Sequence, residues 1–335
     1  MEIKKLLEKL SNAECIGNIN EAALIAEAEL KRFAKVSRHG TVGIVGKINK
    51  GKQKTLLLDA HIDEVGFVVT AVFPSGFVKV SNVGGIDPRI LPANRVVIHG
   101  KEKVSAVFTS TPPHLAKKEN EAVTLEDIYL DTALGEKAEE LISVGDFVTF
   151  DSRFTAMGKN FTGKSFDDRA AVACLLEVAS RIYDKDLPVN VIISLSEQEE
   201  LGCRGAATSA FDAECDEAIA LDVSFGTAPG IPSHESGKLG GGVMIGISPV
   251  LSKKMTDKLT EIAKNRSIAH QFEVMGGKTS TDADVISITK GGIPSALLSV
   301  PLRNMHTPVE VINKDDLASV CDLLEAYIMG GGAND

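Results

Sequence analysis

Two glutamates beyond an apolar segment are the first candidates for chemistry in this chain. The run Val189 to Leu195 has three consecutive β-branched residues at its centre and predicts a buried strand. It leads into Glu199 and Glu200, which are followed by Gly202. Acidic side chains at the carboxyl end of such a strand lie where open α/β sheets bind their ligands. If both lie on one strand, they point to opposite sides, so one could bind a metal ion while the other faces water or substrate. A solvated acidic turn is the alternative for this segment alone.

Other metal-ligating residue types follow other predicted strands. The positions that share this placement are His61, Asp167, Glu200, Asp222 and His306. Taken singly, each is more often a core histidine, a helix cap or a turn former, but strand ends gather at one edge of a sheet. Two imidazoles with three carboxylates suit zinc, cobalt or manganese better than calcium or magnesium. Five ligands are too many for one catalytic zinc ion, but they suffice for two ions that share a bridging carboxylate.

The candidates lie in two stretches of the chain that have an α/β pattern, and a segment with a different pattern separates these stretches. Near the N-terminus, helical spacing covers 3–10 and 20–33, and strands are predicted at 41–46 and 54–58. The second strand leads into His61 and Asp63, which are two residues apart and so share a face. The pattern returns with a helix opening at Phe166, strands at 189–195, 218–222, 243–247 and 294–300, and helices capped by Ser252 and Asn313.

The segment between these α/β parts has short strands broken by proline and glycine, with one helix near 134–141. We therefore predict one domain made of 1–68 plus 160–335, interrupted by a β-rich module at 69–159. The α/β part contains all the candidate ligands, so the module is expected to serve contact or access. A satellite domain that packs only on its own chain is the alternative.

Composition limits the function classes. The chain has 335 residues, of which 44% are hydrophobic, and a net charge of −10, which disfavours nucleic-acid and anionic-membrane partners. Five cysteines without a CxxC pair indicate free thiols in a reducing compartment. The N-terminus lacks the apolar core of a signal peptide, and no apolar run approaches the ~20 residues of a membrane span. The expected location is cytoplasmic.

Six segments together carry a resemblance to a known family. They are 59–67, 166–169, 199–206, 220–223, 281–283 and 301–310, spread over nearly the whole chain. Each is a weak signal alone, but in this order they resemble the M42 co-catalytic metallo-aminopeptidases, which include glutamyl and deblocking aminopeptidases and tetrahedral assemblies. The resemblance implies an α/β fold, a mixed-sheet, zinc-exopeptidase-like catalytic domain with an inserted β-rich dimerisation domain.

The resemblance also implies roles for the candidate residues. Two divalent ions, zinc or cobalt with manganese as a further option, would be held with Asp167 between them, His61 and Asp222 on one ion, and Glu200 and His306 on the other. Glu199 would be the general base, and Asp63 would orient the imidazole of His61. The Asp167–Asp168 peptide bond is expected to be cis.

The activity implied is removal of N-terminal residues from peptides with a free amino terminus. The implied partners are further copies of the chain, first as a dimer through the insertion and then as a tetrahedral dodecamer. The preferred N-terminal residue depends on pocket shape and on loops such as 233–242, which the sequence does not place.

Two other function classes compete with this interpretation. A glycoside hydrolase would use paired carboxylates, but the chain has no tryptophan and 5% aromatic residues with which to stack sugars. That function would also leave the histidines without a role. A non-catalytic scaffold that only binds metal would have no need of Glu199.

Overall fold

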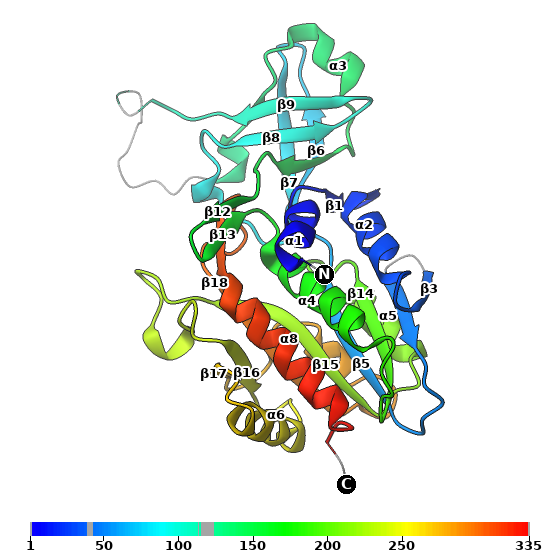
Figure 1. The fold of residues 1–335 in the computed structure, drawn as a ribbon. Coiled ribbons are helices and arrows are strands. Elements are labelled where there is room, and N and C mark those ends of the chain that lie inside the picture. Colours follow the sequence, from blue (N-terminus) through cyan, green and yellow to red (C-terminus); the bar gives the residue numbers. More distant parts are fainter. Residues whose placement is uncertain (1, 39–42, 113, 115–123, 334–335) are drawn as a thin grey trace.

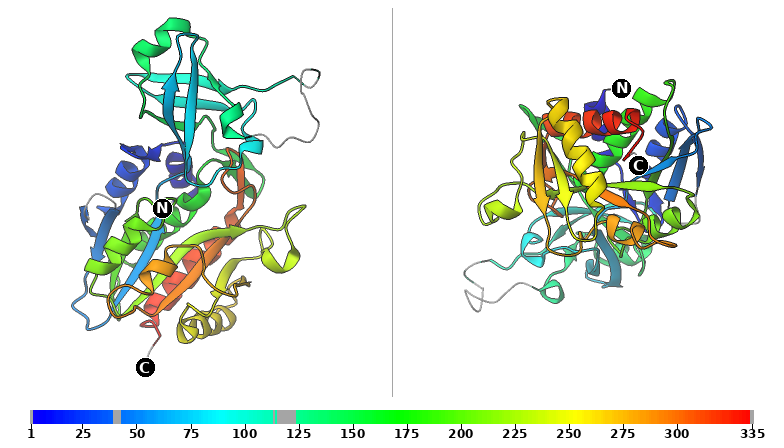
Figure 2. Two further views of the ribbon diagram at one scale, coloured as in Figure 1. Left: turned by 180° about the vertical axis from the view of Figure 1, so that it is seen from behind. Right: turned by 90° about the horizontal axis from the view of Figure 1, so that it is seen from below.

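The computed structural model describes residues 2–38, 43–112, 114 and 124–333. Figure 1 shows an α/β part with a β-barrel at one end, and the left view of Figure 2 shows the barrel at the end away from the C-terminus. Within the described residues, every helix falls short of the length and apolar character that crossing a membrane requires.

The α/β part is built on an eight-stranded mixed sheet. Its strand order is β17-β16-β18-β15-β5-β14-β4-β3. The strands are β3 Lys35–Arg38, β4 Gly43–Ile48, β5 Thr55–His61, β14 Asn190–Ser196, β15 Glu217–Phe225, β16 Val243–Ile247, β17 His270–Val274 and β18 Ser295–Leu302. The four strands β18, β15, β5 and β14 run parallel to one another, so their carboxyl ends meet at one edge. The first two residues of the strand predicted at 41–46 lie outside the described residues.

Helices cover both faces of this sheet. They are α1 Ile3–Ser11, α2 Glu21–Leu30, α4 Phe166–Ile182, α5 Arg204–Asp212, α6 Lys253–Asn265, α7 Ala283–Ile286 and α8 Lys314–Met329. Helices α4 and α8 cross the near face in Figure 1, whereas α5 and α7 pack on the opposite face. Strand alternation explains both layers. Leu56 and Leu58 of β5 belong to the apolar cluster that includes α4 and α8, whereas Leu57 belongs to the cluster that includes α5 and α7.

The predicted helix caps are confirmed in two of three cases. Ser252 accepts a hydrogen bond from the backbone N–H of Met255, and Asn313 accepts one from that of Asp315. Asn20 precedes α2, but its side chain makes no capping hydrogen bond, and the helix ends at Leu30 rather than at residue 33.

The inserted segment forms a closed six-stranded barrel with the order β10-β7-β6-β11-β8-β9. Its strands are β6 Gly66–Val72, β7 Phe77–Val83, β8 Arg95–His99, β9 Lys103–Phe108, β10 Leu130–Asp131 and β11 Phe147–Phe150. It has its own apolar core, in which the ring of Phe67 lies 5.0 Å from that of Phe108 and 5.7 Å from that of Phe150, between centroids. The predicted helix near 134–141 corresponds to the short α3, Ala138–Leu141.

Two small sheets lie outside the main sheet and the barrel. Strands β12 Thr155–Met157, β13 Asn160–Gly163 and β19 Glu310–Asn313 form a three-stranded sheet, and β1 Cys15–Ile16 pairs with β2 Ile19–Asn20. The barrel strands begin at Gly66, and β12 pairs outside the barrel although it falls within 69–159. The division of the chain at 69 and 159 therefore stays a prediction.

Candidate metal centre

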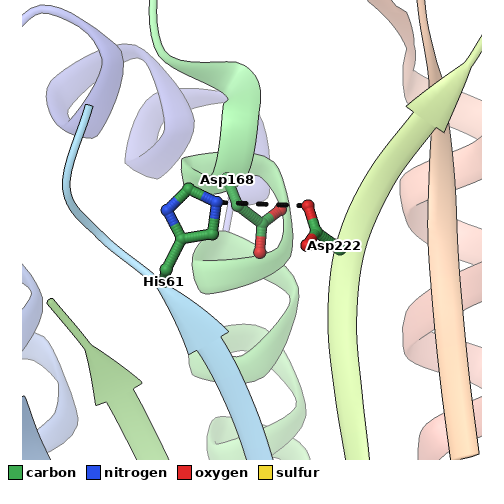
Figure 3. Close-up of side chains that lie close together, drawn as sticks. All are labelled: His61, Asp168 and Asp222. Atoms are coloured by element: carbon green, nitrogen blue, oxygen red, sulfur yellow. Dashed lines mark ion pairs between the residues drawn. The ribbon is translucent and has the colours of Figure 1, made fainter. Parts of the chain in front are cut away.

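Two strands and a helix bring three donors together at the carboxyl edge of the sheet. His61 is the last residue of β5, and Ala220 of β15 pairs with Asp59, so Asp222 is level with His61 across the two strands. Figure 3 shows His61 and Asp222 converging with Asp168 from the start of α4. These three offer ligand atoms within 4.8 Å of one another.

Asp167 joins this group to a second imidazole. Its Oδ1 lies 3.0 Å from Nε2 of His61, and its Oδ2 lies 3.2 Å from Nε2 of His306. The same His306 nitrogen lies 3.2 Å from Oε1 of Glu200. The structure therefore brings all five sequence-predicted ligand candidates into one cluster, with the carboxylate of Asp167 in the middle. The Asp167–Asp168 peptide bond is cis, as expected.

The two glutamates do not lie on one strand, so the condition under which they would point to opposite sides is not met. Strand β14 ends at Ser196, and both residues lie in the following turn, which is closed by a hydrogen bond from the N–H of Gly202 to the carbonyl of Glu199. Strand alternation therefore does not set their directions. They still face different groups, because Oε2 of Glu199 lies 4.0 Å from Nε2 of His61 whereas Glu200 contacts the other imidazole.

Asp63 connects this turn to the first imidazole. Its Oδ1 accepts a hydrogen bond of 3.1 Å from the backbone N–H of Glu199. The same oxygen lies 3.5 Å from Nδ1 of His61. Asp63 thus holds the Glu199 turn and faces the ring nitrogen that points away from Asp167.

The barrel contributes a contact to the other imidazole. The carbonyl oxygen of Gly85 lies 2.5 Å from Nδ1 of His306. A carbonyl can only accept, so Nδ1 carries the proton and Nε2 is the nitrogen available to a ligand. The inserted segment, which was expected to serve contact or access, therefore also holds the ring of a candidate ligand through a backbone group, and a backbone group gives no sequence signal.

The carboxylates of the cluster carry negative charge that the protein must neutralise. Burial alone would lower the pKa of His61, yet hydrogen bonds to Asp167 and Asp63 raise it well above its usual value. Burial opposes the shift at His306 as well, but Asp167 and Glu200 raise its pKa to about 11. Burial and then the charge of Asp167 raise the pKa of Asp222. A divalent cation would meet the same need as these protons.

An unpartnered buried oxygen points the same way. Asp168 is fully buried, and its Oδ2 has no hydrogen-bond partner within the described residues. A buried polar atom without a partner costs free energy unless a proton, a water or an ion satisfies it. The mixed nitrogen and oxygen donors, their burial and this oxygen together fit a site for divalent metal ions.

Glu310 is a site residue whose role sequence reasoning missed. Its Oε2 accepts hydrogen bonds from the backbone N–H groups of Phe166, at 2.6 Å, and Asp167, at 3.3 Å. Its Oε1 accepts one of 3.0 Å from the N–H of His306. One buried carboxylate thus holds the two segments that carry Asp167 and His306. Its partners are backbone groups, so only its place in the segment 301–310 could have drawn attention to it.

A cavity of about 400 Å³ opens beside the cluster. Candidate ligands and Glu199 line one side of it, and Phe225, Glu273 and Met305 are among the other lining residues. The loop 233–242, considered above as a determinant of specificity, is not among the described residues that line it. The cavity leaves this side of the cluster accessible to a bound molecule.

Comparisons with known proteins agree with this geometry. Residues 41–323 match the sequence profile of the M42 glutamyl aminopeptidases. A lysyl aminopeptidase of Pyrococcus furiosus is 29% identical over 287 residues, covering 83% of this chain and 82% of that protein. The crystal structure of a TET aminopeptidase from a marine sediment archaeon of the Thaumarchaeota has a TM-score of 0.93 at 28% identity, covering 98% and 96% of the two chains.

A further structure is informative about assembly in a relative. The TET1 peptidase of Pyrococcus horikoshii, which can assemble into a tetrahedron or a large octahedral shell, has a TM-score of 0.86 at 28% identity. The alignment covers 98% of this chain and 99% of that one.

The comparisons decide between the function classes considered from the sequence. The glycoside hydrolase and the non-catalytic scaffold are not favoured, and metal-dependent aminopeptidase activity is confirmed as the function. The matched region contains the whole candidate metal centre, from His61 to His306. The chain therefore belongs to the M42 glutamyl aminopeptidase family.

Proposed function

We propose that this aminopeptidase works with two divalent ions, zinc or cobalt with manganese as the further option. The ligands we propose are Asp167 between the ions, His61 and Asp222 on one, and Glu200 and His306 on the other. The observation that carries the proposal is the position of Asp167, whose two carboxylate oxygens face two separate imidazoles.

Glu199 is the general base in this proposal. Bound there, two divalent ions would supply Lewis-acid chemistry for the carbonyl of the first peptide bond and would lower the pKa of the attacking water. Glu199 accepts a proton from that water and delivers it to the leaving amine. Its carboxylate suits this role because it lies at the edge of the cluster and lines the adjoining cavity.

Asp63 and the cavity complete the proposed site. Asp63 faces Nδ1 of His61 and positions the turn that carries Glu199. The free α-amine of the substrate would be held at the metal centre or by nearby carboxylates that bind no ion, of which Glu273 lines the cavity. The first side chain of the peptide then enters the cavity lined by Phe225 and Met305.

We also propose that the barrel mediates self-association, with 1–68 plus 160–335 as the catalytic domain and 69–159 as the inserted domain. The barrel has a separate apolar core and contributes none of the five proposed ligands. Phe73 and Phe77, which are 37% and 36% exposed, offer aromatic surface near Tyr129. Dimers through this surface would then associate into a closed shell, as the TET1 peptidase of Pyrococcus horikoshii can.

The cysteines support a cytoplasmic location for this peptidase. All five are free thiols, and Cys15, Cys174 and Cys321 are buried. Thiols persist in this form in a reducing compartment.

The substitution Glu199→Gln tests the proposed mechanism. The amide keeps the shape of the side chain but accepts no proton, so kcat should fall by about 10²–10⁴-fold while metal content and fold stay unchanged. The matched control is Glu197→Gln in the same turn, which should retain activity. Wild-type kcat in Glu199→Gln would overturn the assignment of the base.

A further inference from the structure

A second donor cluster lies on the other side of Glu199. The Sγ of Cys203 is 3.4 Å from Oε1 of Glu199. Together with Asp282, these residues offer three ligand atoms within 4.8 Å of one another. Cys203 immediately precedes α5 and Asp282 immediately precedes α7, so the cluster is held by two helices on one face of the sheet. Neither Cys203 nor Asp282 belongs to the ligand set proposed above.

Asp282 carries an unsatisfied oxygen in this cluster. The residue is 1% exposed, and its Oδ2 lies 2.9 Å from Oγ of Ser196. Its Oδ1 has no hydrogen-bond partner within the described residues. Buried carboxylate oxygens are almost always satisfied, so this atom calls for a partner that the protein does not supply.

Asp59 is a second buried carboxylate next to Asp282. Asp59 is fully buried, and its Oδ2 lies 3.0 Å from the same hydroxyl of Ser196. The Ser196 hydroxyl can donate its one proton to only one of the two carboxylates, so a proton on the Oδ2 of the other, donated to Oγ, accounts for the second contact. It does not account for Oδ1 of either residue, and both are without a partner in the part of the chain that the structure describes. No ion pair to Asp59 or Asp282 occurs in that part either.

The donor types select a class of ligand. A thiolate with two carboxylates suits zinc or the softer cadmium ion and does not suit magnesium or calcium. In a tetrahedral zinc site, sulfur and oxygen ligands lie about 3.6 Å apart, given bonds of about 2.3 and 2.1 Å. The separation of 3.4 Å between Cys203 and Glu199 already matches that spacing. The remaining ligand separations, up to 4.8 Å, require the side chains to close by about 1 Å.

We propose that Cys203, Glu199 and Asp282 bind a single Zn²⁺ or Cd²⁺ ion and that this ion inhibits the peptidase. Binding releases the thiol proton to solvent and draws the carboxylate of Glu199 towards Cys203, away from the cavity. Glu199 then cannot accept a proton from the attacking water. The inhibitory effect rests on the role proposed for Glu199, whereas cation binding does not depend on it.

Cadmium titration of the protein already loaded with its activating metal tests the proposal. Cadmium bound to a thiolate gives an ultraviolet charge-transfer absorption, which we expect in the wild type to saturate at one ion per chain, with a parallel loss of activity. The variants Cys203→Ser and Cys203→Ala should lose this absorption and keep their basal activity. They should also require at least about tenfold more cadmium for the same inhibition. The matched control is Cys215→Ser, at the other partly exposed cysteine, which should behave as the wild type.

Four results contradict the proposal. Absence of the absorption in the wild type, or its persistence in both Cys203 variants, overturns the site. Equal inhibition of wild type and variants means that cadmium displaces the catalytic ions instead, and this also overturns it. If cadmium binds Cys203 without inhibiting, the inhibitory claim fails. The kinetics of Glu199→Gln, measured separately, then show whether the proposed function fails with it.

Discussion

Replacing Glu64 by glutamine should destabilise the protein by removing the centre of a buried ion network. Oε1 of Glu64 lies 2.8 Å from Nη2 of Arg169 and accepts a hydrogen bond of 2.8 Å from the N–H of Cys15. Oε2 lies 2.5 Å from Nζ of Lys164 and 2.7 Å from Oγ of Ser165. The side chains of Glu64, Lys164 and Arg169 are at most 4% exposed, so glutamine would leave two buried cations without a counter-charge.

The pKa of Glu64 gives the magnitude. Burial alone would raise it, but Arg169 and Lys164 lower it from 4.5 to about 2. The difference of 4.5 − 2 corresponds to about 3.4 kcal/mol, at about 1.36 kcal/mol per pKa unit. Burial also lowers the pKa of Lys164 in spite of Glu64, so part of this gain is offset by desolvation of the lysine. We therefore expect a loss of about 3 kcal/mol, the lower end of the range for broken buried ion pairs.

The pH dependence has a definite sign. The pKa of Glu64 is lower in the folded than in the unfolded state, so its stabilisation is fully present above about 4.5 and is lost as the pH falls through about 2. Urea unfolding of metal-loaded wild type, Glu64→Gln and the exposed control Glu139→Gln, near neutral pH and in acid, measures it. The difference in free energy of unfolding between wild type and Glu64→Gln should decrease as the pH falls from about 4.5 to about 2. Equal stability near neutral pH, or a gap that stays constant into acid, would refute the reasoning.

Two further substitutions probe the site and the barrel. Asp63→Asn keeps an oxygen for the N–H of Glu199 but removes the negative charge facing Nδ1 of His61, so metal affinity should fall about 10–100-fold in chelator competition, with the fold unchanged. Unaltered affinity would remove Asp63 from the proposed site. Phe67→Ala empties the barrel core and should cost about 3–5 kcal/mol, with dissociation of the oligomer in light scattering at a lower temperature than in the wild type. The control for stability is Phe73→Ala, which truncates a partly exposed ring of the barrel. Equal melting temperatures of Phe67→Ala and Phe73→Ala would contradict the expectation.

The parts of the fold that the sequence predicted well are those fixed by local pattern. The run 189–195 corresponds to β14, Asn190–Ser196, because a strand inside the sheet that is buried on both faces is mostly apolar. The caps Ser252 and Asn313 were predictable because a short polar side chain before a helix satisfies its first N–H groups. The five ligand candidates could be selected from the sequence because their residue types recur after predicted strands, and the structure brings them together. Their pairing on two ions comes from the resemblance and stays a proposal.

What the sequence could not provide depends on tertiary contacts with no local signal. The chain turns after Ser196, so the directions of Glu199 and Glu200 follow from the turn and not from strand alternation. The contacts of Glu310 with the N–H groups of Phe166 and Asp167, and of His306 with the Gly85 carbonyl, join a side chain or ring to backbone groups more than 100 residues away. Such contacts leave no periodicity for sequence reasoning to detect.

The central claim is a site with two divalent ions bridged by Asp167, and counting metal ions in active protein tests it most directly. Elemental analysis of a fully active preparation should give two ions per chain. Removing them with a chelator should abolish activity, and zinc or cobalt should restore it in proportion to the occupancy of both positions. One ion per chain, or none, in a preparation with full activity would contradict the account.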